Sequence, residues 1–287
     1  MTPQEIGTQI AFPIVLMTVM FGLGLSLTGT DFSRVFRAPR PALVGILGHA
    51  VLLPLTAFGV LSLWNFPPLV AGGLVILAAC PGGAVSNAIV YAGRGDVALA
   101  VTLTAISSVI TVFTIPIVVG FGMAHFAGMA AAVRLDFLDT VAQLGAIILI
   151  PMFTGMGIRH FFPAFATRAE RYFRVLAIIL LIGLVAAGGL VATGVELRDL
   201  QYAFAAVLML LAGATAAGYA VCALARLDTV RTMTVVIEIG VQNAATAYLI
   251  GGTLLKEPGL ILTPGIYAVM MFLAGGFAIL VARRAGA

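Results

Sequence analysis

The sequence predicts an all-α membrane protein that crosses the bilayer many times. Hydrophobic residues make up 62% of the 287 residues and charged residues only 9%. A soluble domain carries about 25% charged residues, so this chain has too few charges to cover a globule in water. Its apolar runs have the ~20-residue length of a spanning helix, whereas a transmembrane barrel shows alternating segments of ~10 residues. An ordinary soluble enzyme, a disordered chain and a nucleic-acid-binding protein are excluded.

We predict nine membrane-spanning helices within a single transmembrane domain, residues 1–287. The expected spans are 8–28, 41–63, 69–92, 97–119, 138–158, 174–194, 201–224, 232–254 and 260–281. The start of the chain has no Lys or Arg before the first span and so lacks the basic region of a signal peptide. We therefore expect the first span to be retained. Residues 120–136 are too polar for a further span, and we expect an interfacial helix there.

Basic residues predict the orientation, because cytoplasmic loops of membrane proteins are enriched in Lys and Arg. With the N-terminus outside and the C-terminus in the cytoplasm, the predicted cytoplasmic segments hold twelve Arg residues. The outer segments then hold only Arg134, Arg198 and Lys256. We interpret the net charge of +4 as this topology signal in a plasma (inner) membrane, and not as a surface that binds nucleic acid.

Two predicted spans contain residues that interrupt a helix. Pro-Gly-Gly at 81–83 breaks the third span, and Ser86 and Asn87 follow in the next turn. Proline removes a backbone donor and glycine weakens a helix. In the eighth span, an acid, a glycine and two amides fall within residues 238–243. Interrupted spans at matching positions of two inverted halves indicate the binding site of a transporter. The expected halves are about 8–119 and 138–282.

Glu238 is the acid that most needs a partner, because it lies well inside a predicted span. A carboxylate at that depth costs about 2.5–3.5 kcal/mol on insertion. Its candidate partners are a metal cation, a proton or the imidazole of His49; a protonated structural Glu is the alternative. Small hard cations bind oxygen donors, and side chains with such donors lie near both interruptions: Ser86, Asn87, Thr102, Thr104, Ser107, Ser108, Gln242 and Asn243. For Thr102, Ser107 and Ser108, helix packing is the favoured interpretation.

These motifs resemble those of the bile acid:sodium symporter family. Cys-Pro-Gly-Gly-Ala-Val-Ser-Asn at 80–87, continuing through Gly-Asp-Val-Ala-Leu at 95–99 to Thr104, looks like the first signature of the family. Glu-Ile-Gly-Val-Gln-Asn at 238–243 looks like the second, and Met-Phe-Gly-Leu-Gly-Leu at 20–25 followed by Asp-Phe matches the opening pattern. The similarity extends over nearly the whole chain, from about residue 20 to residue 282.

The resemblance implies a panel domain and a core domain in which two broken helices cross near the membrane midplane. It implies secondary active transport of a small organic anion, such as a bile acid, pantoate or a keto acid, by alternating access. No cofactor is expected apart from the coupling ion, and no enzymatic activity. An intramembrane enzyme and an ion channel are the alternative functions, although no protease or prenyltransferase motif is found in the sequence.

The resemblance also assigns residues to three sites. A first sodium site matches Ser86, Asn87, Thr104 and Glu238. A second matches Glu238, Gln242 and the carbonyl groups of Ile239 and Val241, with His49 where the family commonly has a glutamine. The surroundings of the substrate match Gly83, Ala84, Val85 and Asn243.

The chain departs from the family pattern at two sodium ligands. Ala100 stands where a serine is common, and His49 replaces the glutamine oxygen. Imidazole is a poor ligand for a hard cation but a good proton acceptor. The coupling ion is therefore sodium or a proton, and we favour protons or a weakened sodium dependence.

Overall fold

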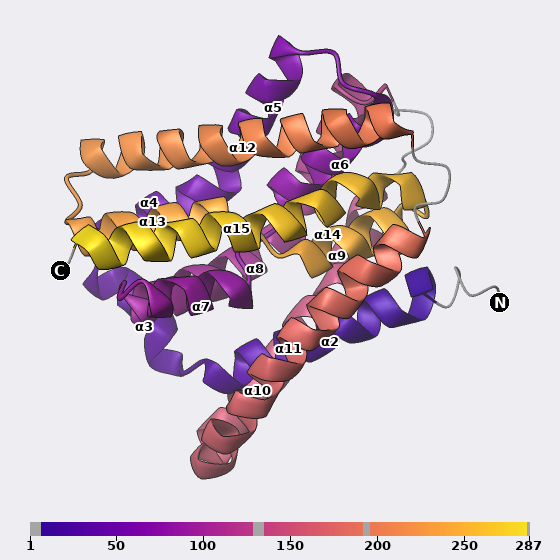
Figure 1. The fold of residues 1–287 in the computed structure, drawn as a ribbon. Coiled ribbons are helices and arrows are strands. Elements are labelled where there is room, and N and C mark those ends of the chain that lie inside the picture. The colour runs from indigo at the N-terminus through magenta and orange to yellow at the C-terminus, as the bar shows by residue number, and fades with distance from the viewer. Residues whose placement is uncertain (1–6, 129–134, 192–195, 286–287) are drawn as a thin grey trace.

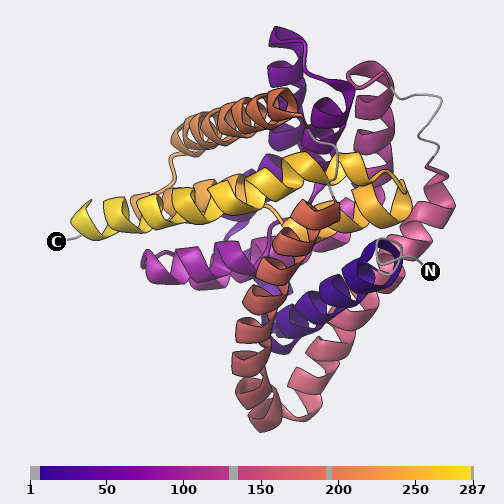
Figure 2. The ribbon, with the colours of Figure 1, turned by 45° about the vertical axis from the view of Figure 1, so that its right-hand side comes forward.

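A computed structural model describes residues 7–128, 135–191 and 196–285 of the chain, and these residues fold almost entirely into helices. Three helices run together, obliquely to the rest (Figures 1 and 2): α2 (Phe12–Ser26), α10 (Ile150–Phe161) and α11 (Pro163–Val191). We call them the oblique layer. α9 (Phe137–Leu144) leads into α10 through the π-helical turn Gly145–Leu149.

The remaining helices form a second group, and one of them, α6, is buried along most of its length. Every residue from Val70 to Ala79 is buried, as expected for a helix that is hydrophobic on all sides. These helices are α3 (Gly29–Arg37), α4 (Pro39–Leu47), α5 (Leu53–Leu63), α6 (Pro68–Ala79), α7 (Ala84–Ala92), α8 (Val97–His125), α12 (Leu197–Leu224), α13 (Thr229–Gly240), α14 (Ala244–Tyr248) and α15 (Leu262–Ala285), with the 3₁₀-helix Pro258–Ile261 before α15.

Six helical stretches among the described residues are long and apolar enough to cross a membrane: Gly7–Ser26, Pro39–Leu63, Val97–His125, Phe137–Phe161, Leu197–Leu224 and Pro258–Gly276. The chain is therefore a polytopic membrane protein. Large apolar side chains such as Leu138, Ile150 and Leu208 are exposed on these helices, as contact with lipid requires. The predicted spans 69–92 and 232–254 are each divided between shorter helices. The predicted span 174–194 begins within α11 and ends outside the described residues.

The prediction of a separate interfacial helix over residues 120–136 is wrong where the structure describes this segment. α8 continues without a break to His125, and α9 begins at Phe137. Residues 129–134 lie outside the described part of the chain. Gly122 lets this part of α8 pack closely on α6, because a Cβ at this glycine would lie 2.4 Å from Val75 Cγ1. The segment that looked polar in the sequence therefore begins with a helix face packed tightly on α6.

Three helices contain a π-helical turn that ends just before a proline. The turns are Gly7–Ala11, Gly48–Leu52 and Gly145–Leu149, and the prolines are Pro13, Pro54 and Pro151. Proline has no N–H and clashes with the carbonyl group one turn earlier, so a wider turn accommodates it without ending the helix. Such turns occur frequently at functional sites, and the second of the three contains His49.

Two glycines bring α2 and α10 into backbone contact within the oblique layer. A Cβ at Gly24 would lie 2.1 Å from the carbonyl oxygen of Met152, and one at Gly155 would lie 2.5 Å from that of Phe21. Membrane helices commonly associate through small residues that allow such an approach. These two helices are therefore held against each other by close packing.

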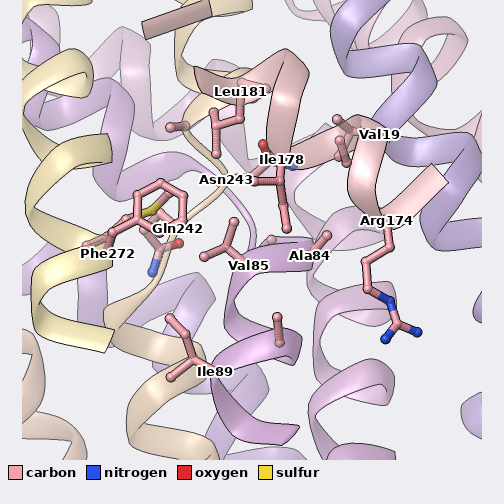
Figure 3. A pocket seen from close by; sticks show the side chains of 16 residues that line it. Val19, Ala84, Val85, Ile89, Arg174, Ile178, Leu181, Gln242, Asn243 and Phe272 are labelled. Carbon is pink, nitrogen blue, oxygen red and sulfur yellow. The ribbon is translucent and has the colours of Figure 1, made fainter. Parts of the chain in front are cut away.

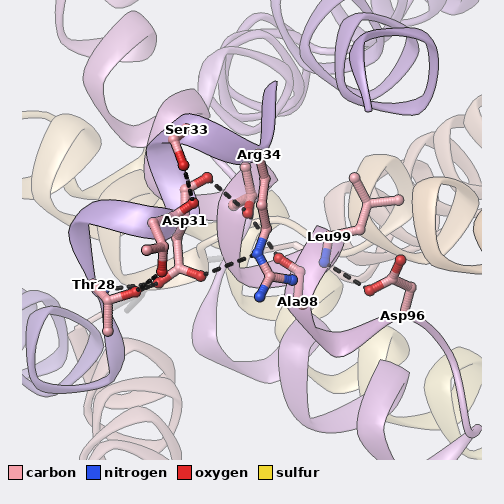
Figure 4. Close-up of polar contacts among 9 residues, drawn as sticks. Thr28, Asp31, Ser33, Arg34, Asp96, Ala98 and Leu99 are labelled. Carbon is pink, nitrogen blue, oxygen red and sulfur yellow. Dashed lines mark hydrogen bonds and ion pairs between the residues drawn. The ribbon is translucent and has the colours of Figure 1, made fainter. Parts of the chain in front are cut away.

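A capped turn connects the oblique layer to the other helices (Figure 4). The Asp31 carboxylate accepts hydrogen bonds of 2.7 Å from both the backbone N–H and the hydroxyl of Thr28, which caps α3. The Thr102 hydroxyl of α8 donates to the Asp31 carbonyl oxygen at 3.1 Å. The chain leaving α2 is thus fixed onto the start of α8.

Candidate functional site

The two predicted interruptions lie against each other and pair through their backbones. The first separates α6 from α7 at Cys80–Gly83, and the second separates α13 from α14 at Val241–Asn243. Gly82 and Gln242 form an antiparallel bridge, and the Asn243 N–H donates to the Pro81 carbonyl oxygen at 2.8 Å. Backbone groups freed at membrane depth need a protein partner or water, and here each interruption supplies partners for the other.

Gly82 lies against two buried ionisable side chains. A Cβ at Gly82 would lie 2.8 Å from Glu238 Oε2 and 3.3 Å from His49 Nε2. The Glu238 carboxylate and the His49 imidazole are therefore neighbours beside the point where the two interruptions pair, which we call the crossing point. We call the buried group of His49, Gly82, Glu238 and Gln242 the ion chamber.

The four residues matched to the first sodium site lie together around Glu238, which is fully buried. Thr104 donates its hydroxyl to Glu238 Oε2 at 2.8 Å, and Asn87 Nδ2 donates to the Thr104 hydroxyl at 3.2 Å. The Ser86 hydroxyl faces the same carboxylate and also donates to the Gly83 carbonyl oxygen at 2.6 Å. Among the described residues, Glu238 forms no ion pair and its Oε1 has no hydrogen-bond partner. A buried, half-satisfied carboxylate surrounded by oxygen donors suits a small cation or a proton.

His49 and Gln242 also leave polar atoms unused in the ion chamber. His49 is 2% exposed, and within the described part of the chain neither ring nitrogen has a hydrogen-bond partner. The Gln242 side chain lies beside this ring; its Nε2 donates to the Ile239 carbonyl oxygen, while its Oε1 has no partner. Ile239 and Val241 are buried in the same region. Unsatisfied buried polar atoms are rare and call for an explanation such as an unseen ion or water.

Ala100 lies one turn before Thr104 on α8 and is fully buried. Residues four apart share a helix face, so a serine at this position would add an oxygen near the Glu238 cluster. The other hydroxyl groups of α8 satisfy its backbone, since Thr102, Ser107 and Ser108 each donate to a carbonyl group within the helix. These three are structural hydroxyls, as the packing interpretation predicts.

A cavity adjoins the crossing point on the side of the oblique layer (Figure 3). We call it the crossing cavity; it has a volume of about 210 Å³ and opens to the outside of the protein. Its core side is lined by Gly83, Ala84, Val85, Ala88, Ile89, Gln242, Asn243, Ala244, Ala245, Met271 and Phe272, and its oblique-layer side by Val19, Arg174, Ala177, Ile178 and Leu181. All four residues matched to the substrate therefore line one cavity.

Asn243 is the polar core residue that is best placed to hold a ligand in this cavity. Its Oδ1 accepts from the Thr246 N–H at 3.2 Å and so caps α14, whereas its Nδ2 has no partner and the residue is 5% exposed. Among the described residues, no side chain caps the start of α7 after Gly83, although the Ser86 N–H donates to the Gly83 carbonyl oxygen. The other N–H groups of a first helical turn lack partners within the helix and can bind an anion.

Two residues of the site were not found from the sequence. Tyr267 of α15 accepts a hydrogen bond from the Gln242 N–H and donates one to the Gly240 carbonyl oxygen, each at 2.7 Å, and so holds the second interruption in place. In the sequence, Arg174 was used only as one of the basic residues that predict the orientation, yet it lines the crossing cavity. A tyrosine within an apolar span was the available signal for Tyr267, whereas only the position of α11 identifies Arg174.

Paired interruptions around a buried carboxylate, next to an open cavity, define a membrane protein of the transporter class. The chain matches the family model described as Sodium Bile acid symporter family over residues 13–195. It belongs to this family, which is a family of transporters and not of enzymes.

Several relatives match most of the chain. It is 29% identical to the probable sodium/metabolite cotransporter BASS1, chloroplastic, of Arabidopsis thaliana, over 80% of this chain and 56% of the relative. It is 27% identical to the uncharacterized sodium-dependent transporter YocS of Bacillus subtilis, over 80% and 70% of the two chains. It is 25% identical to the human ileal sodium/bile acid cotransporter, over 80% and 65%. The chain thus spans between about half and 70% of the length of these relatives.

Proposed function

We propose that the protein is a secondary active transporter that couples the movement of a cation to the movement of a small organic anion. The anion would carry a carboxylate, as bile acids, pantoate and keto acids do. The observation that carries this proposal is the pairing of the two interruptions between the ion chamber and the crossing cavity. One face of the paired segments presents oxygen donors to Glu238, and the other presents Asn243 and the start of α7 to a cavity. Cation and anion would then bind side by side, as in other transporters with broken helices.

The proposed fold has nine spans in two inverted halves, about 8–119 and 138–282, within one transmembrane domain. The six long apolar stretches support this count together with α11 and the two interrupted pairs, α6 with α7 and α13 with α14. In this proposal the oblique layer is the panel domain and the remaining helices form the core domain. Movement of one group against the other would open the crossing cavity to each side of the membrane in turn.

For the coupling ion, we propose sodium at the cluster of Ser86, Asn87, Thr104 and Glu238. The printed names of the relatives, which include sodium-dependent transport, support this assignment. At the second site, formed by Glu238, Ile239, Val241, Gln242 and His49, we propose that a proton on His49 replaces the second sodium ion. The unpartnered ring nitrogens beside the Glu238 carboxylate support that replacement.

The proposed location is the plasma membrane, with the N-terminus outside and the C-terminus in the cytoplasm. A second cavity adjoins the crossing cavity and shares Val19, Ala84, Ala88, Arg174 and Ala177 with it. It continues past Asn87 to Ser26 and Tyr91, which lie near the predicted cytoplasmic ends of their helices. In this orientation the conformation described here is open to the cytoplasm.

The test is uptake of labelled pantoate, pyruvate and taurocholate into liposomes under separately imposed sodium and proton gradients. Glu238→Gln removes the carboxylate that belongs to both proposed cation sites. It should abolish gradient-driven uptake while the protein remains folded. Asp139→Asn, which removes an exposed carboxylate on α9, is the matched control and should transport normally. Wild-type uptake by a folded Glu238→Gln protein would refute the proposal.

A further inference from the structure

Arg174 is a cation placed at the junction of the two cavities, on the side opposite the crossing point. It lines both the crossing cavity and the adjoining cavity, and Figure 3 shows its side chain extending along one edge of the site. Its guanidinium group pairs with Glu170 one turn earlier on α11; the Arg174 side chain is 56% exposed and that of Glu170 19%. Arg171, on the same helix, lines neither cavity.

The ion pair leaves Arg174 available to a ligand. A partly exposed pair of residues four apart on a helix is a weak interaction, so an incoming carboxylate can compete with Glu170 for the guanidinium group. A guanidinium group binds a carboxylate through two parallel hydrogen bonds. When no anion is present, the ion pair with Glu170 keeps the Arg174 guanidinium group at the cavity.

The opposite wall offers a second polar contact that is also unused. Asn243 Nδ2 is buried without a partner and faces the same cavity. Apart from Gln242, the other side chains that line this cavity are apolar and include Val19, Ile178 and Leu181. A ligand that satisfies both ends would therefore need an apolar body with a hydrogen-bond acceptor at each end.

We infer that Arg174 binds an acidic group of the transported anion from the side of the oblique layer, while Asn243 binds an acceptor at its other end. This inference rests on the proposed function and narrows the substrate class to compact organic anions with two polar ends, of which dicarboxylates are the simplest example. Such a ligand bridges the two groups of helices. A monocarboxylate without a second acceptor uses only one of the two contacts and binds more weakly.

The experiment measures thermal stabilisation of the purified protein by dicarboxylates from butanedioate to octanedioate, each compared with the monocarboxylate of equal chain length. At constant ionic strength, at least one dicarboxylate should bind the wild-type protein about tenfold more tightly than its monocarboxylate, as expected for one charge-assisted hydrogen-bonded contact. Arg174→Gln should abolish this preference. Arg174→Lys, which keeps the charge without the paired hydrogen bonds, should retain part of it, and Arg171→Gln all of it.

A dicarboxylate preference that survives in Arg174→Gln would overturn the inference, as would a wild-type protein without any such preference. The response of the same samples to sodium separates this result from a failure of the proposed function. Sodium stabilises the wild-type protein through Glu238 in the proposed function, whether or not Arg174 binds the anion. Loss of dicarboxylate preference in Arg174→Gln with an unchanged sodium response is the expected outcome.

Discussion

Replacing His49 by Gln together with Ala100 by Ser should strengthen the sodium dependence of transport. His49 is 2% exposed, with both ring nitrogens unpartnered beside the Glu238 carboxylate, and Ala100 is fully buried one turn before Thr104. Each substitution adds one side-chain oxygen that could bind a cation, at a position where the wild-type side chain has no oxygen. A contact between a polar group and a charge contributes about 1.5–3 kcal/mol. One added ligand should therefore tighten sodium binding by roughly 10–100-fold.

Two assays measure this change. Sodium titration of thermal unfolding reports the affinity without a substrate, and uptake into liposomes under separate sodium and proton gradients reports the coupling. The wild-type protein should respond to the proton gradient, and the double variant should gain stimulation by sodium. His160→Gln, at an exposed histidine on α10, is the control and should change neither response. A wild-type protein that depends strictly on sodium and is indifferent to a proton gradient would refute the role given to His49.

Three further substitutions test the parts of the site separately. Asn243→Ala removes the unpartnered Nδ2 of the crossing cavity and should weaken anion binding more than cation binding; equal losses in calorimetry would contradict this role. Tyr267→Phe leaves the Gln242 N–H and the Gly240 carbonyl group without their partner and should lower the free energy of unfolding by about 1–3 kcal/mol. Thermal unfolding measures this loss, and Tyr219→Phe, at an exposed tyrosine, is the control. Gly155→Ala should destabilise the protein by about 1–3 kcal/mol through overpacking. Gly157→Ala on the same helix should not, because nothing lies within 4 Å of a Cβ at Gly157. Equal melting temperatures of the two variants would refute the close contact of α2 and α10.

The sequence was sufficient to predict the long apolar helices and the two interruptions, because both depend on local chemistry. Spanning helices need an apolar run, and Pro81 with its neighbouring glycines disfavours a helix wherever the segment lies in the fold. Glu238 was identifiable for the same reason, since a lone carboxylate within an apolar run is costly. These signals require no knowledge of which helices are neighbours.

Features that depend on the packing of distant segments could not be predicted. Arg174 resembles the other basic residues at helix ends, and only the position of α11 beside α7 brings it to the crossing cavity. The segment 120–136 was misjudged because its residues look too polar in the sequence to continue a span, whereas Gly122 is a packing contact for Val75. The hydrogen bonds of Tyr267 likewise join residues 25 and 27 positions apart.

The second interruption offers a physical route by which binding of the anion and the cation would be coupled. Gln242 lines the crossing cavity, and its side chain also lies beside His49 in the ion chamber. Asn243, the next residue, lines the same cavity, and its N–H donates to the Pro81 carbonyl oxygen of the first interruption. A ligand in the crossing cavity and a cation in the ion chamber would therefore restrain the same segment, residues 241–243. Ordering of this segment by one ligand lowers the entropic cost of binding the other. Such coupling is reciprocal. An anion that contacts Asn243 should therefore raise the affinity of the protein for sodium, and sodium should raise the affinity for that anion by the same factor.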